Sequence, residues 1–181
     1  ETAWRHAVNT SPENDRAHYN LAFELQKIGK IDEALIHYAL SIDLGQEQPW
    51  EHFGMGSALH DLERWSEAAN HYAHALNLDP NYCDAHNNMG VVLKASGELG
   101  RAAEHFRRAA ELEPTDVDVL SNLAVTLIET GEFAEAVEFY QRALALRPTD
   151  ALLWNDMGTA LAQQGLFAEA VRVFARAIEE D

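Results

Sequence analysis

Apolar residues recur along this chain in steps of three and four, with polar residues between them. Leu123 and Leu127 keep this spacing in one stretch, and Ala136, Tyr140 and Leu144 keep it in the next. This is the spacing of one face of an α-helix, so the pattern predicts two amphipathic helices in close succession.

Glycine and proline mark the ends of these predicted helices. A glycine separates the two stretches of a pair, and glycine adopts the left-handed conformation of a helix end at little cost. A proline follows the second stretch, and proline cannot continue a helix interior. The glycines are Gly29, Gly97, Gly131 and Gly165, and the prolines are Pro12, Pro80, Pro114 and Pro148.

The whole pattern repeats every 34 residues. One column of the repeat holds alanine, one holds leucine and one holds an aromatic ring. These columns are Ala34, Ala68, Ala102, Ala136 and Ala170; Leu25, Leu59, Leu93, Leu127 and Leu161; and Tyr38, Tyr72, Phe106, Tyr140 and Phe174. Small side chains let paired helices approach closely, and large ones fill the space between units. The repeat therefore predicts an all-α stack of antiparallel helix pairs.

The repeating unit is similar to the tetratricopeptide repeat, which has this length and this order of columns. The residues that carry the resemblance in one unit are Asn122, Leu123, Ala124, Gly131, Ala136, Tyr140, Ala143 and Pro148. The resemblance implies an all-α, right-handed superhelical α-solenoid whose first helices line a concave groove. The array resembles the repeat domains of bacterial tetratricopeptide repeat scaffold proteins and of O-linked N-acetylglucosamine transferases.

The repeat divides the chain into five units, preceded by the second helix of an incomplete repeat in residues 1–14. The five units are residues 15–48, 49–82, 83–116, 117–150 and 151–181. Trp4, Ala7 and Pro12 match the aromatic, small and proline columns of the incomplete repeat. No polar C-terminal capping helix follows the fifth unit. We therefore expect a segment of a longer protein, with apolar ends through which copies can associate.

Three positions depart from the pattern. Glu63 stands where other units have glycine, so either it is left-handed, at a cost of about 1–2 kcal/mol, or the turn differs. Gln46 replaces the expected proline, which makes the junction between the first two full units the least regular. A column that is usually bulky and apolar in the family holds His18, His52 and His86.

The charge of the chain excludes some partners. The sequence has 13 Lys and Arg residues against 30 Asp and Glu, a net charge of −17, which repels nucleic acid and anionic membrane surfaces. No apolar run is long enough to span a bilayer, and residues 1–14 lack the features of a signal peptide. Cys83 is the single cysteine, so neither an intrachain disulfide nor a cysteine zinc cluster is expected. The compartment stays undecided, with the cytoplasm slightly favoured over the periplasm.

Nine histidines raise the question of a metal site. Residues in one column of the repeat lie on neighbouring helices about 8–10 Å apart, whereas zinc ligands lie about 2 Å from the ion. We expect no metal site and no cofactor, although His71 and His74 lie three residues apart on one predicted helix. The sequence also lacks a phosphate-binding glycine loop, a nucleophile elbow and a His-Glu-x-x-His motif. The chain is therefore not expected to be an enzyme.

The resemblance places side chains of each first helix on the concave wall. We take fifteen of them as the candidate partner-binding groove: Arg16, Tyr19, Asn20, Phe23, Lys27, Trp50, Phe53, Ser57, His60, Asn87, Asn88, Val91, Lys94, Asn122 and Asn155. The aromatic members cluster in the first two full units beside Arg16 and Lys27. This combination would suit a protein or peptide segment with apolar and acidic side chains. The alternative is that some of these rings pack between units.

Little of the negative charge is expected on this wall. Three basic residues, Arg16, Lys27 and Lys94, accompany five acidic ones, Asp61, Asp84, Asp118, Glu129 and Asp156. The wall thus carries a net charge of about −2, and the rest of the chain carries most of the excess.

Asparagine recurs at one groove position, as Asn20, Asn88 and Asn122, while Gly54 and Asp156 interrupt the column. An asparagine amide can donate to and accept from a peptide backbone whatever its sequence. The column is similar to the asparagine ladder of O-linked N-acetylglucosamine transferases. The alternative is that these asparagines stabilise the fold. The basic positions that clamp a C-terminal carboxylate in chaperone cofactors of this family hold Tyr19, Phe23, Asn87 and Val91, so that ligand is not expected.

The leading hypothesis is a non-catalytic scaffold that binds a peptide segment or partner protein in the groove. One alternative is the substrate-recognition repeat domain of a larger enzyme such as a glycosyltransferase. A second alternative is the soluble repeat tail of a bacterial membrane protein, which rests on the resemblance of the segment from Trp4 to Leu21.

Overall fold

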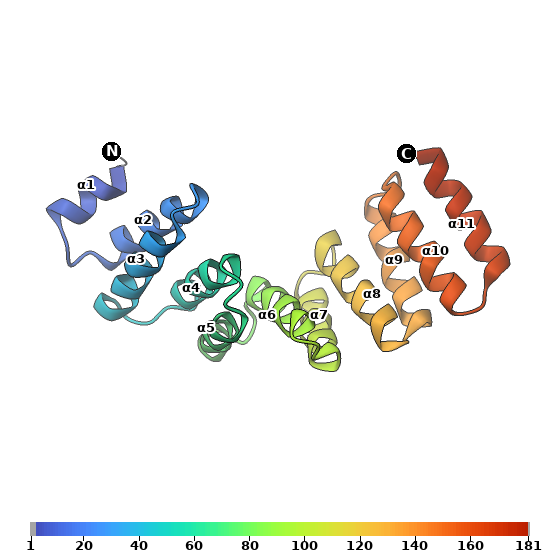
Figure 1. Ribbon diagram of the computed structural model, residues 1–181, viewed down its shortest axis with the longest axis horizontal. Coiled ribbons are helices and arrows are strands. Elements are labelled where there is room, and N and C mark those ends of the chain that lie inside the picture. Colours follow the sequence, from blue (N-terminus) through green and yellow to red (C-terminus); the bar gives the residue numbers. More distant parts are fainter. Residues whose placement is uncertain (1–2, 181) are drawn as a thin grey trace. The chain divides into compact units, whose positions relative to one another are not determined.

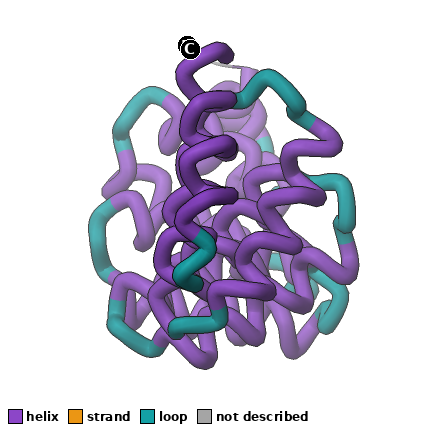
Figure 2. Tube along the Cα trace, turned by 90° about the vertical axis from the view of Figure 1, so that its right-hand side faces the viewer, coloured by secondary structure: helices purple, strands orange, loops and turns teal. Residues whose placement is uncertain are grey.

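The computed structural model describes residues 3–180, which form eleven α-helices joined by short loops and contain no strand (Figures 1 and 2). The helices are α1 (Ala3–Thr10), α2 (Asp15–Lys27), α3 (Ile31–Leu44), α4 (Pro49–Asp61), α5 (Trp65–Leu78), α6 (Cys83–Ala95), α7 (Leu99–Leu112), α8 (Val117–Thr130), α9 (Phe133–Leu146), α10 (Ala151–Gln163) and α11 (Phe167–Glu180). The prediction of an all-α fold is confirmed. Among these residues, no helix combines the length and apolar character needed to cross a membrane.

The chain forms two compact units, residues 1–92 and residues 93–181, with the boundary inside α6. The first unit contains α1 to α5 and most of α6, and the second contains the end of α6 and α7 to α11. Within each unit, consecutive helices pair and each pair packs on the next (Figure 1).

The turn inside each pair is a left-handed residue. The backbone φ angles of Gly29, Gly97, Gly131 and Gly165 are +77°, +79°, +86° and +86°. Glu63 takes the same role with φ 57°, and it is the one non-glycine residue with positive φ in the described part of the chain. The turn therefore has the same form in the unit that lacks glycine, at a strain cost of about 1–2 kcal/mol.

The core lies between the paired helices. Ala34, Ala68, Ala102 and Ala136 are fully buried, and the ring of Tyr38 packs on Leu21, Leu25 and Ala34 in the first unit. The absence of a larger side chain in the alanine column lets the two helices of a pair approach closely. The large apolar columns then fill the interior, as the sequence pattern predicts.

The unusual histidine column has a structural explanation. The ring nitrogens of His18, His86 and Trp154, which share one position in the repeat, lie 3.1, 3.1 and 2.8 Å from the carbonyl oxygens of Pro12, Pro80 and Pro148. A carbonyl only accepts, so the ring N–H donates in each case. His18 and His86 therefore supply the same hydrogen bond as the tryptophan and tie the loop before the helix to its second turn. His52 does not, because its Nε2 is buried without a hydrogen-bond partner among the described residues, in the repeat where Gln46 replaces the proline.

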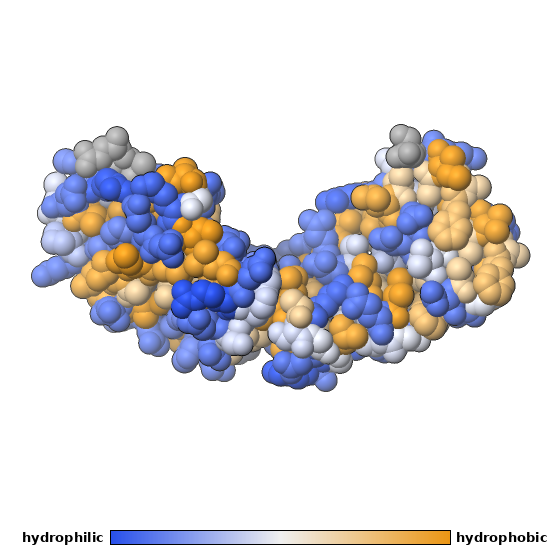
Figure 3. Space-filling view, viewed as in Figure 1, coloured by the Kyte–Doolittle hydropathy of each residue, from blue (hydrophilic) through white to orange (hydrophobic). Residues whose placement is uncertain are grey.

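The outer face of α11 exposes a stripe of apolar side chains. Phe167, Val171 and Ile178 are 68%, 68% and 79% exposed. The same stripe one repeat earlier, on α9, is largely covered by α10: Val137 and Leu144 are buried there. Figure 3 shows apolar surface at the α11 end of this unit.

Candidate functional site

Twelve of the fifteen expected groove residues lie in the first unit. α2 carries Arg16, Tyr19, Asn20, Phe23 and Lys27; α4 carries Trp50, Phe53, Ser57 and His60; and α6 carries Asn87, Asn88 and Val91. Every one of them keeps some solvent exposure, and none is buried. They follow the same face of successive first helices, so we call this set the α2–α4–α6 surface.

A pocket of about 140 Å³ lies on this surface between the first turns of α2 and α4. It is lined by Asp15, Arg16, Tyr19, Asn20, Gln48, Trp50 and Glu51. Four of these seven residues belong to the expected groove. The pocket is large enough for one side chain of a bound segment.

The irregular junction between α3 and α4 forms one wall of this pocket. Pro49 occupies the first turn of α4, and Gln48 and Glu51 form a capping box in which Glu51 Oε2 accepts from the Gln48 backbone N–H at 3.0 Å. The other carboxylate oxygen accepts from the Ser41 hydroxyl of α3 at 2.5 Å. Glu51 is only 2% exposed, so these two hydrogen bonds satisfy a carboxylate that is almost completely buried.

Sequence reasoning did not place Asp15, Gln48 or Glu51 at the site. The spacing of Gln48 and Glu51 around a proline is a capping-box pattern, and it falls at the junction already marked by the missing proline at Gln46. Read together, these two features would have predicted where α4 begins.

Two aromatic rings form the other walls of the pocket. Tyr19 packs edge-on against the buried ring of Tyr38, with centroids 5.6 Å apart. This contact depends on Gly54, because a Cβ atom there would lie 2.6 Å from Tyr38 Cε1 and 3.2 Å from Tyr19 Cε2. Burial, and to a smaller extent the charge of Glu51, raises the pKa of Tyr19, which keeps its hydroxyl protonated. Trp50 is 40% exposed and offers open ring surface.

The aromatic residues of the surface divide into two kinds. Phe53 packs against Tyr72 and Tyr82 at centroid distances of 5.8 and 5.0 Å. Phe23 and Trp50 are 45% and 40% exposed. The ring contacts of Phe53 and Tyr19 lie within their own repeats, 49–82 and 15–48, whereas Phe23 and Trp50 present ring surface to solvent.

The arginine and the lysine of the surface lack carboxylate partners within the described residues. The guanidinium of Arg16 makes no ion pair there, and the Lys27 ammonium lies 4.3 Å from the centroid of the Phe23 ring. The remaining basic residues of the first unit are ion-paired: Arg5 and Lys30 with Glu33, and Arg64 with Glu67.

The asparagine column faces the tyrosine of the preceding repeat. The Asn88 amide N–H donates to the Tyr72 hydroxyl across a long 3.4 Å contact, and the equivalent position Gly54 is filled by the Tyr38 ring. Asn20 donates to the Arg16 carbonyl of its own helix at 2.7 Å. Part of the hydrogen-bonding capacity of the Asn20 and Asn88 amides is thus used within the fold. This agrees with the interpretation that asparagines of this column stabilise the fold.

α2 and α4 are also joined directly across the surface. The Gln26 amide donates to Ser57 Oγ at 3.1 Å and to Asp61 Oδ2 at 2.7 Å, and its oxygen accepts from the Tyr38 hydroxyl at 3.0 Å. Ser57 is therefore held in place by this network.

The three other expected groove residues lie in the second unit. Lys94 is ion-paired with Glu129 of α8 at 3.0 Å, Asn122 lies on α8, and Asn155 lines a cavity between α10 and α11. The candidate site is described on the first unit, to which these three residues do not belong.

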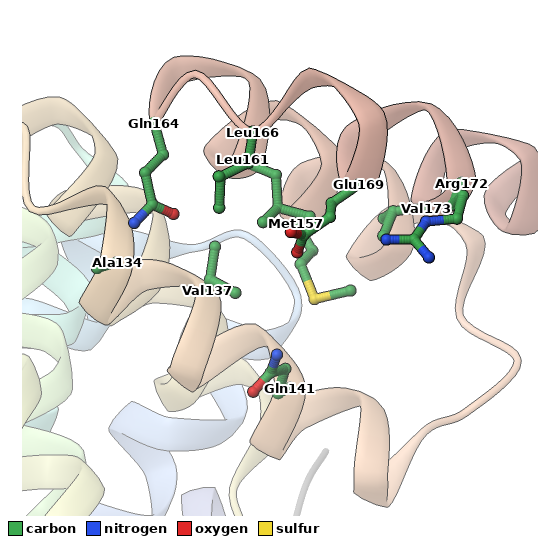
Figure 4. Close-up of a pocket in the computed structure, with 10 residues that line it drawn as sticks. All are labelled: Ala134, Val137, Gln141, Met157, Leu161, Gln164, Leu166, Glu169, Arg172 and Val173. Atoms are coloured by element: carbon green, nitrogen blue, oxygen red, sulfur yellow. The ribbon is translucent and has the colours of Figure 1, made fainter.

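A second cavity, of about 280 Å³, lies between α9, α10 and α11. Figure 4 shows Val137 of α9 pointing toward Leu161 of α10, with Glu169 and Arg172 of α11 nearby. Among residues 3–180, no group of three or more His, Cys, Asp or Glu side chains is arranged to hold a metal ion.

Two family models match the chain. One, described as tetratricopeptide repeat, matches residues 93–155 and 131–181, and the other, described as TPR repeat, matches residues 56–97. Together they cover residues 56 to 181, which is more than half of the chain. No curated protein matches it.

Solved structures of similar fold cover nearly the whole chain. A structure described as YrrB, a TPR protein with an unusual peptide-binding site, matches with TM-score 0.88 at 21% identity, over 99% of this chain and 93% of its own. A MamA structure matches with TM-score 0.85 at 20% identity, over 92% and 91%. MamA from Desulfovibrio magneticus RS-1 matches with TM-score 0.84 at 20% identity, over 92% and 94%. At these identities the likeness concerns the fold, and it confirms the predicted α-solenoid.

Proposed function

The chain belongs to the tetratricopeptide repeat family, and on that premise we propose that it is a non-catalytic scaffold that binds a peptide segment of a partner protein on the α2–α4–α6 surface. The observation that carries the proposal is the combination of exposed aromatic rings with unpaired basic groups on one face of α2 and α4. Trp50 and Phe23 are 40% and 45% exposed, and Arg16 and Lys27 beside them make no ion pair with the described residues.

Exposed aromatic rings and arginine are the residue types that most often dominate the binding energy of protein interfaces. Here they surround a pocket of about 140 Å³ whose walls are held by internal hydrogen bonds of α4. A preformed pocket of this kind lowers the entropy lost when a partner binds. The description of YrrB as a protein with a peptide-binding site supports the same class of ligand for this chain.

The proposal is tested by selecting a phage-displayed library of random 12-residue peptides against the chain and measuring the affinity of synthetic copies by fluorescence polarisation. We expect selected peptides to bind with micromolar or tighter affinity, typical of transient peptide recognition. Trp50→Ala is expected to weaken them, while Ile36→Ala, which removes an apolar side chain that is 61% exposed on α3, leaves binding unchanged. Peptides that bind equally well to both variants would place the site elsewhere.

Asn88 offers a second test of the same surface. If its amide also pairs with the backbone of a bound segment, Asn88→Ala weakens peptides of unrelated sequence by a similar factor and leaves the melting temperature almost unchanged. A large loss of stability with unaltered affinity would assign Asn88 to the fold through its contact with Tyr72.

The apolar stripe of α11 favours a second activity, self-association. The equivalent stripe of α9 is covered by α10 within the chain, whereas Val171 and Ile178 are 68% and 79% exposed. Copies are expected to associate at high concentration, and Val171→Glu with Ile178→Glu is expected to abolish this, as measured by light scattering after size-exclusion chromatography. A chain that stays monomeric at millimolar concentration would refute it.

A further inference from the structure

The first unit has five Lys and Arg residues, and the two without a carboxylate partner among the described residues lie on the same helix face. Three of the five, Arg5, Lys30 and Arg64, are ion-paired with Glu33 or Glu67. Arg16 and Lys27 lie eleven residues apart on α2. Eleven residues complete just over three helical turns, so both side chains leave α2 in nearly the same direction, about 16 Å apart along its axis.

The pocket keeps the Arg16 guanidinium available even though two carboxylates line it. Both oxygens of Glu51 accept hydrogen bonds, from Ser41 and from the Gln48 backbone. Asp15 Oδ1 accepts from the backbone N–H of Arg16 at 2.7 Å rather than from its guanidinium. Both carboxylate oxygens of Glu51 are thus engaged, and neither carboxylate makes an ion pair with the Arg16 guanidinium among the described residues.

We infer that the α2–α4–α6 surface selects a partner segment with one aspartate or glutamate side chain, whose carboxylate pairs with Arg16 in the pocket between α2 and α4. This inference rests on the proposed function and names the chemistry of its ligand. The planar guanidinium of arginine matches a carboxylate with two parallel hydrogen bonds. The rings of Tyr19 and Trp50 line the same pocket and lower the polarity around the pair, which strengthens it.

The ring of Phe23 extends the recognition along α2. It lies two turns beyond Arg16 and is 45% exposed, with the Lys27 ammonium over one side at 4.3 Å. The segment therefore carries an apolar side chain that packs on Phe23, at a fixed separation from its acidic residue.

The charge of the whole chain sets an upper limit on the acidity of this segment. At a net charge of −17, the protein repels a run of acidic residues, and this repulsion acts over roughly 8–10 Å at physiological ionic strength. A single carboxylate in contact with Arg16 is favoured, whereas further carboxylates outside the pocket meet the acidic surface. The surface therefore binds a segment with one acidic residue among apolar ones more tightly than a segment with several consecutive acidic residues.

The experiment uses positional-scanning pools of fluorescein-labelled 12-residue peptides, N-acetylated and C-amidated, in which one position is fixed as Asp, Glu, Asn, Gln, Lys or phosphoserine. We expect pools with fixed Asp or Glu to bind the full chain at least about tenfold more tightly than pools with fixed Asn or Gln. Peptides with three consecutive glutamates are expected to bind more weakly than those with one.

Three variants test whether Arg16 causes the preference for Asp or Glu. Arg16→Gln is expected to abolish it without lowering the melting temperature, because the side chain is exposed and unpaired among the described residues. Arg16→Lys keeps part of it, since lysine retains the charge and loses the fork. Arg172→Gln is the matched control, because Arg172 is an exposed arginine of the other unit that also lacks an ion pair within the described residues.

Two outcomes overturn the inference while leaving the proposed function intact: an Asp or Glu preference that persists in Arg16→Gln, or a preference for Lys, phosphoserine or peptides with a free C-terminal carboxylate. If no pool binds at any position, the proposed function itself fails.

Discussion

The hydroxyl of Ser41 in α3 donates a hydrogen bond to the buried carboxylate of Glu51 in α4, at 2.5 Å. The equivalent positions one repeat later hold Ala75 and Ala85, both fully buried. A polar pair thus takes the place of an apolar contact at the junction where the expected proline is missing. The same carboxylate caps α4, so one residue fixes both the start of α4 and its contact with α3.

Ser41→Ala is expected to lower the free energy of unfolding by about 1–3 kcal/mol, because it leaves one oxygen of a buried carboxylate without a donor. Ser41→Ala with Glu51→Ala recreates the alanine pair of the next repeat and should cost less than the sum of the two single changes. Urea unfolding monitored by circular dichroism provides the comparison. Strict additivity would show that the two side chains are not coupled.

Gly54→Ala is expected to destabilise the first unit by about 1–3 kcal/mol, since the added Cβ would lie 2.6 Å from the buried ring of Tyr38. Gly100→Ala serves as its control in α7, where a Cβ meets no atom within 4 Å. There the change should stabilise the chain, by up to about 1 kcal/mol, through better helix propensity. Equal effects of the two changes in thermal unfolding would contradict the role of Gly54.

Most of the fold is predictable from the sequence because one pattern of residues recurs in five successive units. The buried alanine column and the left-handed glycines each follow from residue type and spacing, since only small side chains fit the close contact and only glycine is left-handed without strain. Glu63 shows the limit: its φ of 57° follows the geometry of the repeat and overrides its own preference.

The candidate site is less predictable, because contacts within single repeats decide it. The pattern places Trp50 and Phe53 on the same face, yet Phe53 packs against Tyr72 and Tyr82 while Trp50 stays 40% exposed. It also treats Lys94 as a groove cation, although Lys94 is ion-paired with Glu129. Such pairings depend on distances between helices that column positions do not specify.

Stability is expected to fall as the pH decreases below about 6.5, because three histidines fold with lowered pKa values. Burial is the main cause for His37, His52 and His71, and neighbouring histidines add to it. Below the pKa of an unfolded histidine, about 6.5, the unfolded chain binds more protons than the folded one. The stabilising contribution is therefore complete above that pH and is lost as the pH falls toward the folded pKa values.

The geometry of two histidine pairs explains why stability falls with pH. The Nδ1 atoms of His52 and His71 lie 3.1 Å apart, and those of His18 and His37 lie 2.9 Å apart. Such a contact needs one donor and one acceptor, so it is lost when both rings are protonated. Glu47 and Glu51 near His52, and Glu67 near His71, oppose the shift without reversing it.

His52→Leu with His71→Phe tests the assignment, because the chain itself uses Leu120 and Phe139 at the same two positions. The difference in melting temperature between pH 7.5 and pH 5.5 should become smaller in this variant. Both pH values lie above about pH 5, where ordinary carboxylates begin to bind protons. An unchanged pH dependence would assign the acid sensitivity to other groups.

Substitutions of Trp50 and Phe53 should have different effects on peptide affinity and on stability. Trp50→Ala is expected to weaken a bound peptide by about tenfold or more, as for exposed aromatic hot spots, and to leave the melting temperature within about 2 °C, because the ring is 40% exposed. Phe53→Ala removes the packing against Tyr72 and Tyr82 and should cost about 2–3 kcal/mol of stability, somewhat less than for a fully buried phenylalanine. Calorimetric titration with a selected peptide, together with thermal unfolding of both variants, gives the two quantities. If Trp50→Ala destabilises the chain as strongly as Phe53→Ala does, the open ring surface of Trp50 is part of the fold, and the pocket between α2 and α4 loses its main wall for a partner.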